Sequence, residues 1–189
     1  MKSLKIATSN HNKIKEIESI LGEGVLQSVI IDLIEIQHEN MLMVAEHKAK
    51  EAYDTLNEAV LIEDTSVCIE SMDNLPGPFI KWFLKALGNK GIIQATDKEK
   101  RKAKAVTILC LYNGSAYIYG KGEIEGTISL EERGSNGFGW DTIFVPNGQK
   151  TKQQKTFAEM TLDEKNIYSM RRKAVEDFKE KYTVNTMFH

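Results

Sequence analysis

The sequence has few of the residues that mark specialised classes of protein. Among its 189 residues are two cysteines and three prolines, and the formal net charge is −2 at pH 7. Cys68 and Cys110 each lie within an apolar run and form no metal-ligand cluster, so we expect buried, reduced thiols in place of a disulfide framework. The nearly balanced charge gives no electrostatic reason to expect nucleic acid or a membrane surface as a partner.

Long hydrophobic runs are also missing. No apolar stretch approaches the roughly 18 residues that a membrane span needs, and residues 1–6 lead straight into a strand-like pattern in place of a signal-peptide apolar region. We therefore expect a cytosolic protein with no membrane partner. Hydrophobic residues make up 41% and charged residues 28% of the chain, as in ordinary globular proteins, and its length fits a single domain over residues 1–189.

The pattern of apolar residues predicts strands that alternate with helices early in the chain. Apolar and β-branched runs predict strands at residues 4–7, 25–33 and 60–62. Helical spacing predicts helices at residues 14–21, 41–56, 79–87 (ended by Gly88) and 161–182. Residues 105–112 and 116–121 form a predicted hairpin across Asn113-Gly114. We therefore expect an α/β protein with a mixed β-sheet, folded as one compact unit.

The first candidate site is the polar turn at residues 8–13, between a predicted strand and a predicted helix. Backbone N–H groups and the positive end of the helix dipole meet there, and Lys13 adds an ammonium suited to a phosphate oxygen. The turn lacks the GxxxxGK[ST] pattern of a Walker A loop. The structural alternative is that Ser9 or Asn10 simply caps the helix.

The second candidate is the pair Glu63-Asp64, at the predicted carboxyl end of a buried strand. Ligands of open α/β sheets bind outside such strand ends, and two adjacent carboxylates could hold Mg²⁺ or activate a water. Glu35 and Glu39 follow another predicted strand and could add a metal ligand. The alternatives are a solvated strand end with Asp64 capping the next turn, and a surface loop around Glu35 and Glu39.

The third candidate is the glycine-dense segment 136–141. Glycines on both sides of Phe138 let the backbone bring an aromatic face close to a flat ligand, and stacking of a base on an aromatic ring contributes about 1–3 kcal/mol. Asp141 could accept a hydrogen bond from a base edge. The alternative is that Phe138 and Trp140 are core residues beside a tight turn.

The fourth candidate is a cationic set in the predicted C-terminal helix. Lys165 and Arg172 are seven residues apart and would share a helix face, with Arg171 close to it. A charged run of this kind is also the usual pattern of a solvated helix face.

Taken together and in this order, these segments resemble the inosine triphosphate pyrophosphatase (ITPase) family. The resemblance covers nearly the whole chain, from the turn at 8–13 (TSNHNK) to Ser169-Met170-Arg171. Its most specific blocks are residues 61–65 (LIEDT), 75–83 (LPGPFIKWF), 138–141 (FGWD), 156–160 (TFAEM) and 164–166 (EKN).

The resemblance implies an elongated mixed β-sheet with flanking helices, two lobes around a central cleft, and a homodimer. It implies hydrolysis of non-canonical purine nucleoside triphosphates (ITP, dITP, XTP) to the monophosphate and pyrophosphate, with Mg²⁺ as cofactor and Mn²⁺ as an alternative metal. By this resemblance, Glu35 and Asp64 hold the metal. Asp64 is the catalytic carboxylate, and Lys13 and Glu63 are further catalytic candidates.

The remaining positions are assigned to the substrate by matching motifs. Contacts to the triphosphate and nucleotide fall on Thr8, Ser9, Asn10, Lys13, Lys48, Asp64, Thr65 and Lys81. Contacts at the base site fall on Phe138, Gly139, Trp140, Asp141, Lys165, Met170 and Arg171.

One position departs from the family pattern. The family has Ser-His-Arg where this chain has Ser169-Met170-Arg171, so Met170 removes a titratable hydrogen-bonding group from the base-recognition corner. We expect an active enzyme whose base preference is looser or shifted, with Arg171 addressing the six-oxo group. Two alternatives remain: a related pyrophosphatase for modified pyrimidine or canonical triphosphates, and a nucleotide-binding module without turnover.

Overall fold

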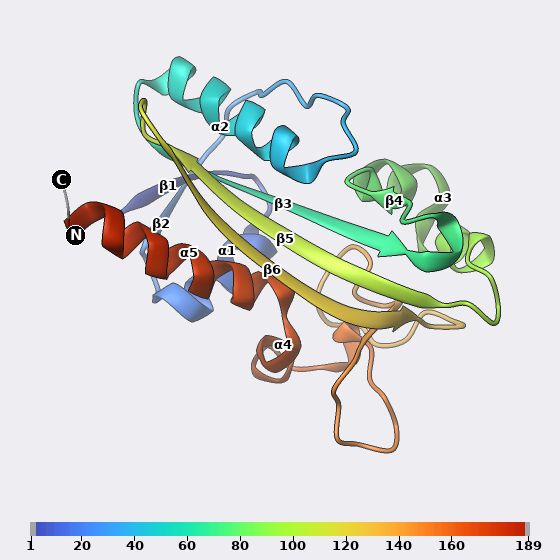
Figure 1. Cartoon of the computed structure of the whole chain (residues 1–189). Coiled ribbons are helices and arrows are strands. Elements are labelled where there is room, and N and C mark those ends of the chain that lie inside the picture. Colours follow the sequence, from blue (N-terminus) through green and yellow to red (C-terminus); the bar gives the residue numbers. More distant parts are fainter. Residues whose placement is uncertain (1–2, 188–189) are drawn as a thin grey trace. The chain divides into compact units, whose positions relative to one another are not determined.

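A mixed β-sheet forms the framework of the chain. The computed structural model describes residues 3–187, and within them seven strands form one sheet in the order β2-β1-β3-β5-β6-β7, with β4 paired to β3 (Figure 1). β1 pairs in parallel with β2 and with β3, whereas β4 pairs antiparallel with β3 and β7 antiparallel with β6. The predicted α/β fold with a mixed sheet is therefore confirmed. The strands are β1 Leu4–Ala7, β2 Leu26–Val29, β3 Val60–Ile69, β4 Pro76–Gly77, β5 Lys102–Tyr112, β6 Tyr117–Ile128 and β7 Phe144–Pro146.

Five α-helices accompany the sheet in the described part of the chain. They are α1 His11–Leu21, α2 Met41–Leu56, α3 Ile80–Ala95, α4 Leu162–Tyr168 and α5 Met170–Met187. Short 3₁₀ helices occupy Glu70–Met72 and Phe157–Glu159. Within residues 3–187, no helix combines the length and the hydropathy that a membrane span requires.

Close backbone contacts divide the chain into two units. The first takes the chain up to Asp64, Thr107–Gly122, and the chain from Met170; the second takes Thr65–Val106 and Glu123–Ser169. Strands β3, β5 and β6 contribute residues to both units. The expectations of a single domain and of two lobes around a cleft stay predictions.

The core of the first unit joins α1 and α5 to the sheet. Apolar side chains from these elements form one buried cluster: Ile6, Ile17, Leu26, Leu61, Leu109, Leu111, Ile118, Ala174, Val175 and Phe178. Two glycines of β6 let α5 approach closely. A Cβ added at Gly120 would lie 2.2 Å from the carbonyl oxygen of Ala174, and one at Gly122 would lie 2.0 Å from that of Met170.

Three aromatic rings pack together in the core of the second unit. Trp140 meets Phe144 edge-on with ring centroids 5.3 Å apart, and Phe144 stacks on Phe157 at 5.4 Å. Trp140 is only 7% exposed and both phenylalanines are fully buried. Trp140 is thus a core residue. For this residue, the alternative interpretation of segment 136–141, a core side chain beside a tight turn, is confirmed.

Several predicted strands have different lengths in the structure. The predicted strand at 105–112 begins at Lys102, and the one at 116–121 spans Tyr117–Ile128. The predicted strand at 25–33 is confined to Leu26–Val29, because β-branched residues favour a strand only where a partner is available, and Ile30 and Ile34 are 86% and 66% exposed. The predicted strand at 60–62 instead continues to Ile69. Glu63 and Asp64 therefore lie inside a strand and not at its carboxyl end, so the prediction of a strand end is wrong.

Two helix predictions also need correction. The predicted single helix at 161–182 is broken at Ser169, whose extended backbone (φ −68°, ψ 126°) separates α4 from α5. Lys165 and Arg172 therefore belong to different helices and do not share a face. Gly88 interrupts α3 with φ 65° and ψ −179°, as the predicted stop implies, but helical residues resume after it.

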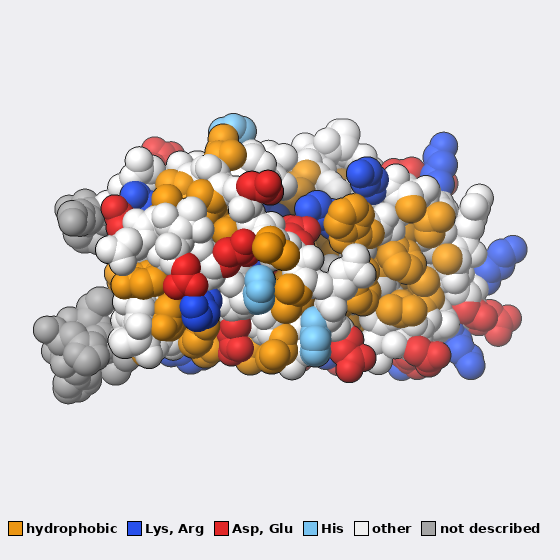
Figure 2. Space-filling model, turned by 90° about the horizontal axis from the view of Figure 1, so that it is seen from above, with side chains coloured by type: hydrophobic (Ala, Val, Ile, Leu, Met, Phe, Trp, Pro, Cys, Tyr) orange, Lys and Arg blue, Asp and Glu red, His pale blue; other side chains and the backbone are white. Residues whose placement is uncertain are grey.

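The surface seen from above mixes charges of both signs (Figure 2). On this face, Lys and Arg side chains lie among Asp and Glu, and apolar side chains gather in groups, the broadest toward the right of the view. This distribution agrees with the nearly balanced net charge of −2.

Candidate functional site

The turn before α1 is organised by its own polar side chains. Asn10 is the N-cap of α1, and its side-chain oxygen accepts hydrogen bonds from the backbone N–H groups of Asn12 at 3.0 Å and Lys13 at 3.4 Å. Thr8 Oγ1 accepts a hydrogen bond from the Asn10 N–H at 3.1 Å. The capping alternative is therefore correct for Asn10. The roles of Thr8, exposed Ser9 and Asn10 toward a phosphate stay predictions.

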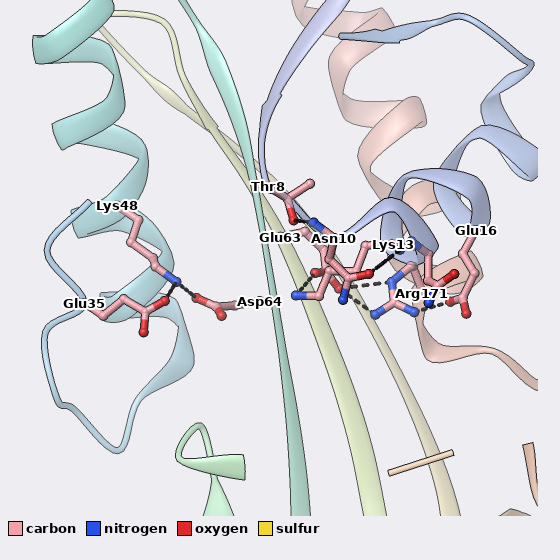
Figure 3. Close-up of polar contacts among 10 residues, drawn as sticks. Thr8, Asn10, Lys13, Glu16, Glu35, Lys48, Glu63, Asp64 and Arg171 are labelled. Carbon is pink, nitrogen blue, oxygen red and sulfur yellow. Dashed lines mark hydrogen bonds and ion pairs between the residues drawn. The ribbon is translucent and has the colours of Figure 1, made fainter. Parts of the chain in front are cut away.

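A buried chain of alternating charges follows this turn (Figure 3). Lys13 Nζ lies 2.5 Å from Glu63 Oε2. Arg171 donates from Nε and Nη2 to the other oxygen of Glu63, at 3.0 and 2.9 Å, and from Nη1 to Glu16. The side chains of Glu63 and Arg171 are 0% and 2% exposed. Residues of α1, β3 and α5 are thus tied together by charge-assisted hydrogen bonds.

The surroundings of Arg171 keep it charged. Burial alone would lower the pKa of its guanidinium, but the carboxylates of Glu63 and Glu16 outweigh burial and hold that pKa above its ordinary value. A buried ion pair with every partner in place is tolerated, whereas removing one partner leaves an uncompensated charge. Arg171 therefore anchors the two carboxylates, and its predicted contact with a base stays a prediction.

Sequence reasoning missed Glu16. Its side chain is 7% exposed and pairs with Arg171, yet a lone glutamate on a predicted surface helix gave no hint of burial. One signal was present in the sequence, because Glu16 follows Lys13 by three residues and so lies on the same side of α1.

A second charged group joins β3 to α2 and to the segment before α2. Lys48 Nζ lies 3.1 Å from Glu35 Oε1 and 3.1 Å from Asp64 Oδ2 (Figure 3). The Lys48 side chain is 12% exposed, so its charge is largely shielded from water. The three predicted residues are therefore brought together, although they come from three separate parts of the chain.

Burial and charge act in opposite directions in this second group. Burial raises the pKa of Asp64 above its ordinary value, although Lys48 and Lys13 oppose the rise. Burial would lower the pKa of Lys48, but Asp64 and Glu35 outweigh it and raise that pKa. Each group thus favours the charged form of its partner.

The two carboxylates are a plausible donor set for a hard divalent cation. Glu35 and Asp64 both direct an oxygen at one positive charge, that of Lys48. Among residues 3–187 no cluster of three or more His, Cys, Asp or Glu side chains could hold a metal. A metal here would keep two carboxylates and complete its shell with water or phosphate oxygens, as Mg²⁺ commonly does. Glu39 is exposed and is not part of this group.

The second unit carries a separate polar group around Asp141. Asp141 Oδ2 accepts hydrogen bonds from Lys165 Nζ at 2.7 Å and from the Phe138 N–H at 2.8 Å. Both charged side chains are 4% exposed, and Lys165 Nζ lies 5.2 Å from the ring centroid of Phe138. Gly137 has φ 73°, and a Cβ there would lie 2.1 Å from Asp141 Oδ2, so only glycine allows this approach.

The 156–160 block supports the same loop. The carbonyl oxygen of Ala158 accepts hydrogen bonds from the N–H groups of Ser135 and Asn136, at 3.1 and 2.9 Å, and the Ala158 N–H donates to the carbonyl oxygen of Asp141 at 3.0 Å. A capping box formed by Thr156 and Glu159 fixes the short helix that presents Ala158. The distinctive TFAEM sequence therefore shapes the loop at 136–141.

Four further predicted contacts are Thr65, Lys81, Gly139 and Met170. Lys81 is exposed on α3, with its ammonium 5.5 Å from the ring centroid of Trp82. Thr65 follows Asp64 on β3 and is half-buried. Met170 is 1% exposed at the start of α5. The roles of Thr65, Lys81, Gly139 and Met170 toward a substrate stay predictions.

The structure is that of an α/β protein with a mixed sheet and buried lysine–carboxylate groups. Comparison with known proteins identifies the family. A family model described as the Ham1 family matches residues 4–181. Over 176 residues the chain is 35% identical to inosine triphosphate pyrophosphatase 2 of Trypanosoma cruzi, covering 90% of this chain and 87% of that protein. Over 184 residues it is 35% identical to a dITP/XTP pyrophosphatase of Methanopyrus kandleri, covering 95% of each.

A solved structure agrees with these sequence matches. A HAM1 protein from Coxiella burnetii aligns with a TM-score of 0.79 at 26% identity, over 98% of this chain and 100% of that chain. This chain belongs to the Ham1 family. The resemblance to inosine triphosphate pyrophosphatases that the sequence motifs indicate is thereby confirmed.

Proposed function

We propose that this chain hydrolyses non-canonical purine nucleoside triphosphates (ITP, dITP and XTP) to the monophosphate and pyrophosphate. The observation that carries the proposal is the convergence of Glu35 and Asp64 on the ammonium of Lys48, each at 3.1 Å. Two carboxylates, which are ligands suited to Mg²⁺, and one ammonium, which is suited to a phosphate oxygen, therefore lie at one point. The names of the relatives in T. cruzi and M. kandleri support the substrate class.

We propose that Glu35 and Asp64 hold Mg²⁺, with Mn²⁺ as an alternative. The chemistry of the donor set supports this, because both are carboxylates directed at one positive charge. When bound, Mg²⁺ supplies positive charge that polarises the phosphate oxygens of the substrate.

The proposed reaction is an attack of water on the α-phosphorus. The water oxygen forms a bond to phosphorus, the bond from phosphorus to the bridging oxygen breaks, and pyrophosphate leaves with that electron pair. Asp64 accepts the proton of the water. Lys13 and Lys48 stabilise the negative charge that develops on the leaving group. Glu63, bound on one side by Arg171, holds Lys13 in place.

Base recognition is proposed to lie with Phe138, Asp141 and Lys165. An ammonium donor suits the six-oxo group of hypoxanthine or xanthine, whereas adenine presents a donor there and leaves a buried donor unpaired. Because Met170 replaces the family histidine, the ratios of kcat/KM for ITP, XTP and GTP are expected to shift in the variant Met170→His. Unchanged ratios would count against a role for this position.

A panel of triphosphates tests the activity. Pyrophosphate and orthophosphate are measured separately with ITP, dITP, XTP, GTP, ATP and a modified pyrimidine triphosphate, with and without Mg²⁺. We expect pyrophosphate as the first product, fastest with the inosine and xanthine bases and dependent on Mg²⁺. Orthophosphate as the first product would contradict the proposal. Preference for another base would favour a related pyrophosphatase for modified pyrimidine or canonical triphosphates. Binding of the triphosphate without any product would favour a nucleotide-binding module without turnover.

A homodimer in the cytoplasm is part of the same proposal. The family resemblance supports the dimer, and sedimentation equilibrium measures the mass of the assembly. A mass near the 21.4 kDa of one chain would contradict it. Microscopy of the tagged protein checks the compartment.

A further inference from the structure

Asn89 connects helix α3 to the loop that carries Asp141. Its side-chain nitrogen lies 2.8 Å from the carbonyl oxygen of Gly139 and 3.0 Å from Thr142 Oγ1. These two acceptors stand on either side of Trp140 and Asp141 in the sequence. One side chain therefore holds both ends of the segment that presents the Asp141 carboxylate.

The surroundings of Asn89 allow only one orientation of its amide. Besides Gly139 and Thr142, the nitrogen faces Glu132 Oε2 at 3.5 Å, and Thr142 Oγ1 itself donates to that carboxylate at 3.2 Å. A carbonyl and a carboxylate need a donor, so a flipped amide would set oxygen against oxygen. In the orientation found, Asn89 Oδ1 is buried and has no hydrogen-bond partner among residues 3–187.

That buried oxygen suggests a role other than stability. The free-energy cost of a buried acceptor without a partner offsets most of what two hydrogen bonds contribute. The two bonds to the loop therefore bring little net stability, and their main consequence is the position of the loop. The hydrogen bonds of Asn89 are therefore better explained by the loop that they position.

The kink at Gly88 places Asn89 next to this loop. Gly88 adopts φ 65° and ψ −179°, a conformation open essentially to glycine alone, and Asn89 follows it directly. Before the kink, Leu84 also reaches the loop, because its Cδ1 lies 3.8 Å from the position of a Cβ at Gly139. Residues of α3 on both sides of its interruption thus lie near Gly139.

We infer that Asn89 is a positioning residue that fixes residues 138–141, and through them the pair Asp141 and Lys165, for recognition of the base. The inference rests on the proposed function, because that proposal assigns this loop to the base. The connection from Asn89 to Asp141 runs through the backbone of the loop. Asn89 donates a hydrogen bond to the Gly139 carbonyl oxygen. Asp141 Oδ2 accepts a hydrogen bond from the Phe138 N–H and so closes the adjoining turn.

Two variants and a neighbouring control test the inference. Asn89→Asp keeps the shape but replaces the donor by an acceptor that faces the Gly139 carbonyl and Glu132, and Asn89→Ala removes both hydrogen bonds. Lys90→Ala changes the exposed next residue of α3. Hydrogen exchange of the backbone amides at 136–141 is measured in each, together with kcat and KM for ITP with Mg²⁺.

We expect faster exchange in the loop and a rise in KM of about tenfold in both Asn89 variants. The change in kcat is expected to be smaller than the change in KM, and Lys90→Ala should match the wild type. Unchanged loop exchange would overturn the positioning role, and faster exchange with unaltered KM would overturn its link to the base. A wild type that releases no pyrophosphate would instead overturn the proposed function, while exchange would still decide whether Asn89 positions the loop.

Discussion

Glu63 lies between two cations, and this pairing explains how a fully buried carboxylate is tolerated in a central strand. Arg171 binds one of its oxygens and Lys13 the other. Arg171 also binds Glu16, so a single guanidinium compensates two buried carboxylates. The stability of the first unit should therefore depend strongly on this arginine.

The variant Arg171→Met should lose about 3–5 kcal/mol of unfolding free energy, because it leaves Glu63 and Glu16 buried without their shared cation. The next residue offers a matched control. Arg172 pairs with Glu176 one turn away with side chains 45% and 50% exposed, and such surface pairs contribute less than about 1 kcal/mol. Urea unfolding of Arg171→Met and Arg172→Met measures the difference in unfolding free energy, and equal losses in the two variants would contradict this account of Arg171.

Cys110 should be unreactive in the folded protein. Burial raises the pKa of its thiol to about 12, so only about one part in 10⁴ is thiolate at pH 8. We expect alkylation by iodoacetamide at pH 8 to be slow in native buffer and fast in urea. Rapid modification of Cys110 in native buffer, located by mass spectrometry, would be incompatible with this burial.

At the residue scale, the sequence was informative where motifs indicated which residues belong to one site. Glu35 and Asp64 were expected at a metal and Lys48 at the nucleotide, and in the structure Lys48 lies 3.1 Å from each carboxylate. The partners of Glu63 were not expected, because Arg171 is 108 positions away in the chain and pairing at that separation leaves no local pattern. Asn89 escaped notice for the same reason.

At the element scale, β6 and α5 approach unusually closely. Gly122 allows this, since a Cβ there would lie 2.0 Å from the carbonyl oxygen of Met170. The variant Gly122→Ala should therefore lose about 1–3 kcal/mol of unfolding free energy through overpacking. It should also weaken triphosphate cleavage, because α5 carries Arg171.

The exposed Glu125 on the same strand supplies the control for this prediction. Glu125→Ala should change the unfolding free energy by less than about 0.5 kcal/mol. Thermal unfolding of the two variants and the wild type gives the comparison. A Gly122→Ala protein as stable as Glu125→Ala would show that the helix can move away without cost.

Elements were predictable where local pattern and packing agree. Helix α2 was expected at residues 41–56, and its bounds are Met41–Leu56. The break at Ser169 was missed because neither proline nor glycine marks it, although its backbone is extended. The continuation of β3 past Ile62 was missed because charged residues usually end a buried strand, and here they are paired by distant cations.

At the scale of the whole molecule, the mixed α/β sheet and the family followed from the sequence. Alternating strands and helices indicated the sheet, and the ordered motifs indicated the relatives. The division into two units did not follow, because β3, β5 and β6 each contribute to both and no linker separates them.

The initial rate of pyrophosphate release from ITP with Mg²⁺ tests the central claim most directly, in the wild type, Asp64→Asn and Asp54→Asn. Asp54 is a matched control, since it pairs with Lys50 one turn away on α2 with a side chain 57% exposed. We predict that Asp64→Asn lowers kcat by about 100-fold or more, and that Asp54→Asn stays within about twofold of the wild type. Full activity of Asp64→Asn would contradict the account.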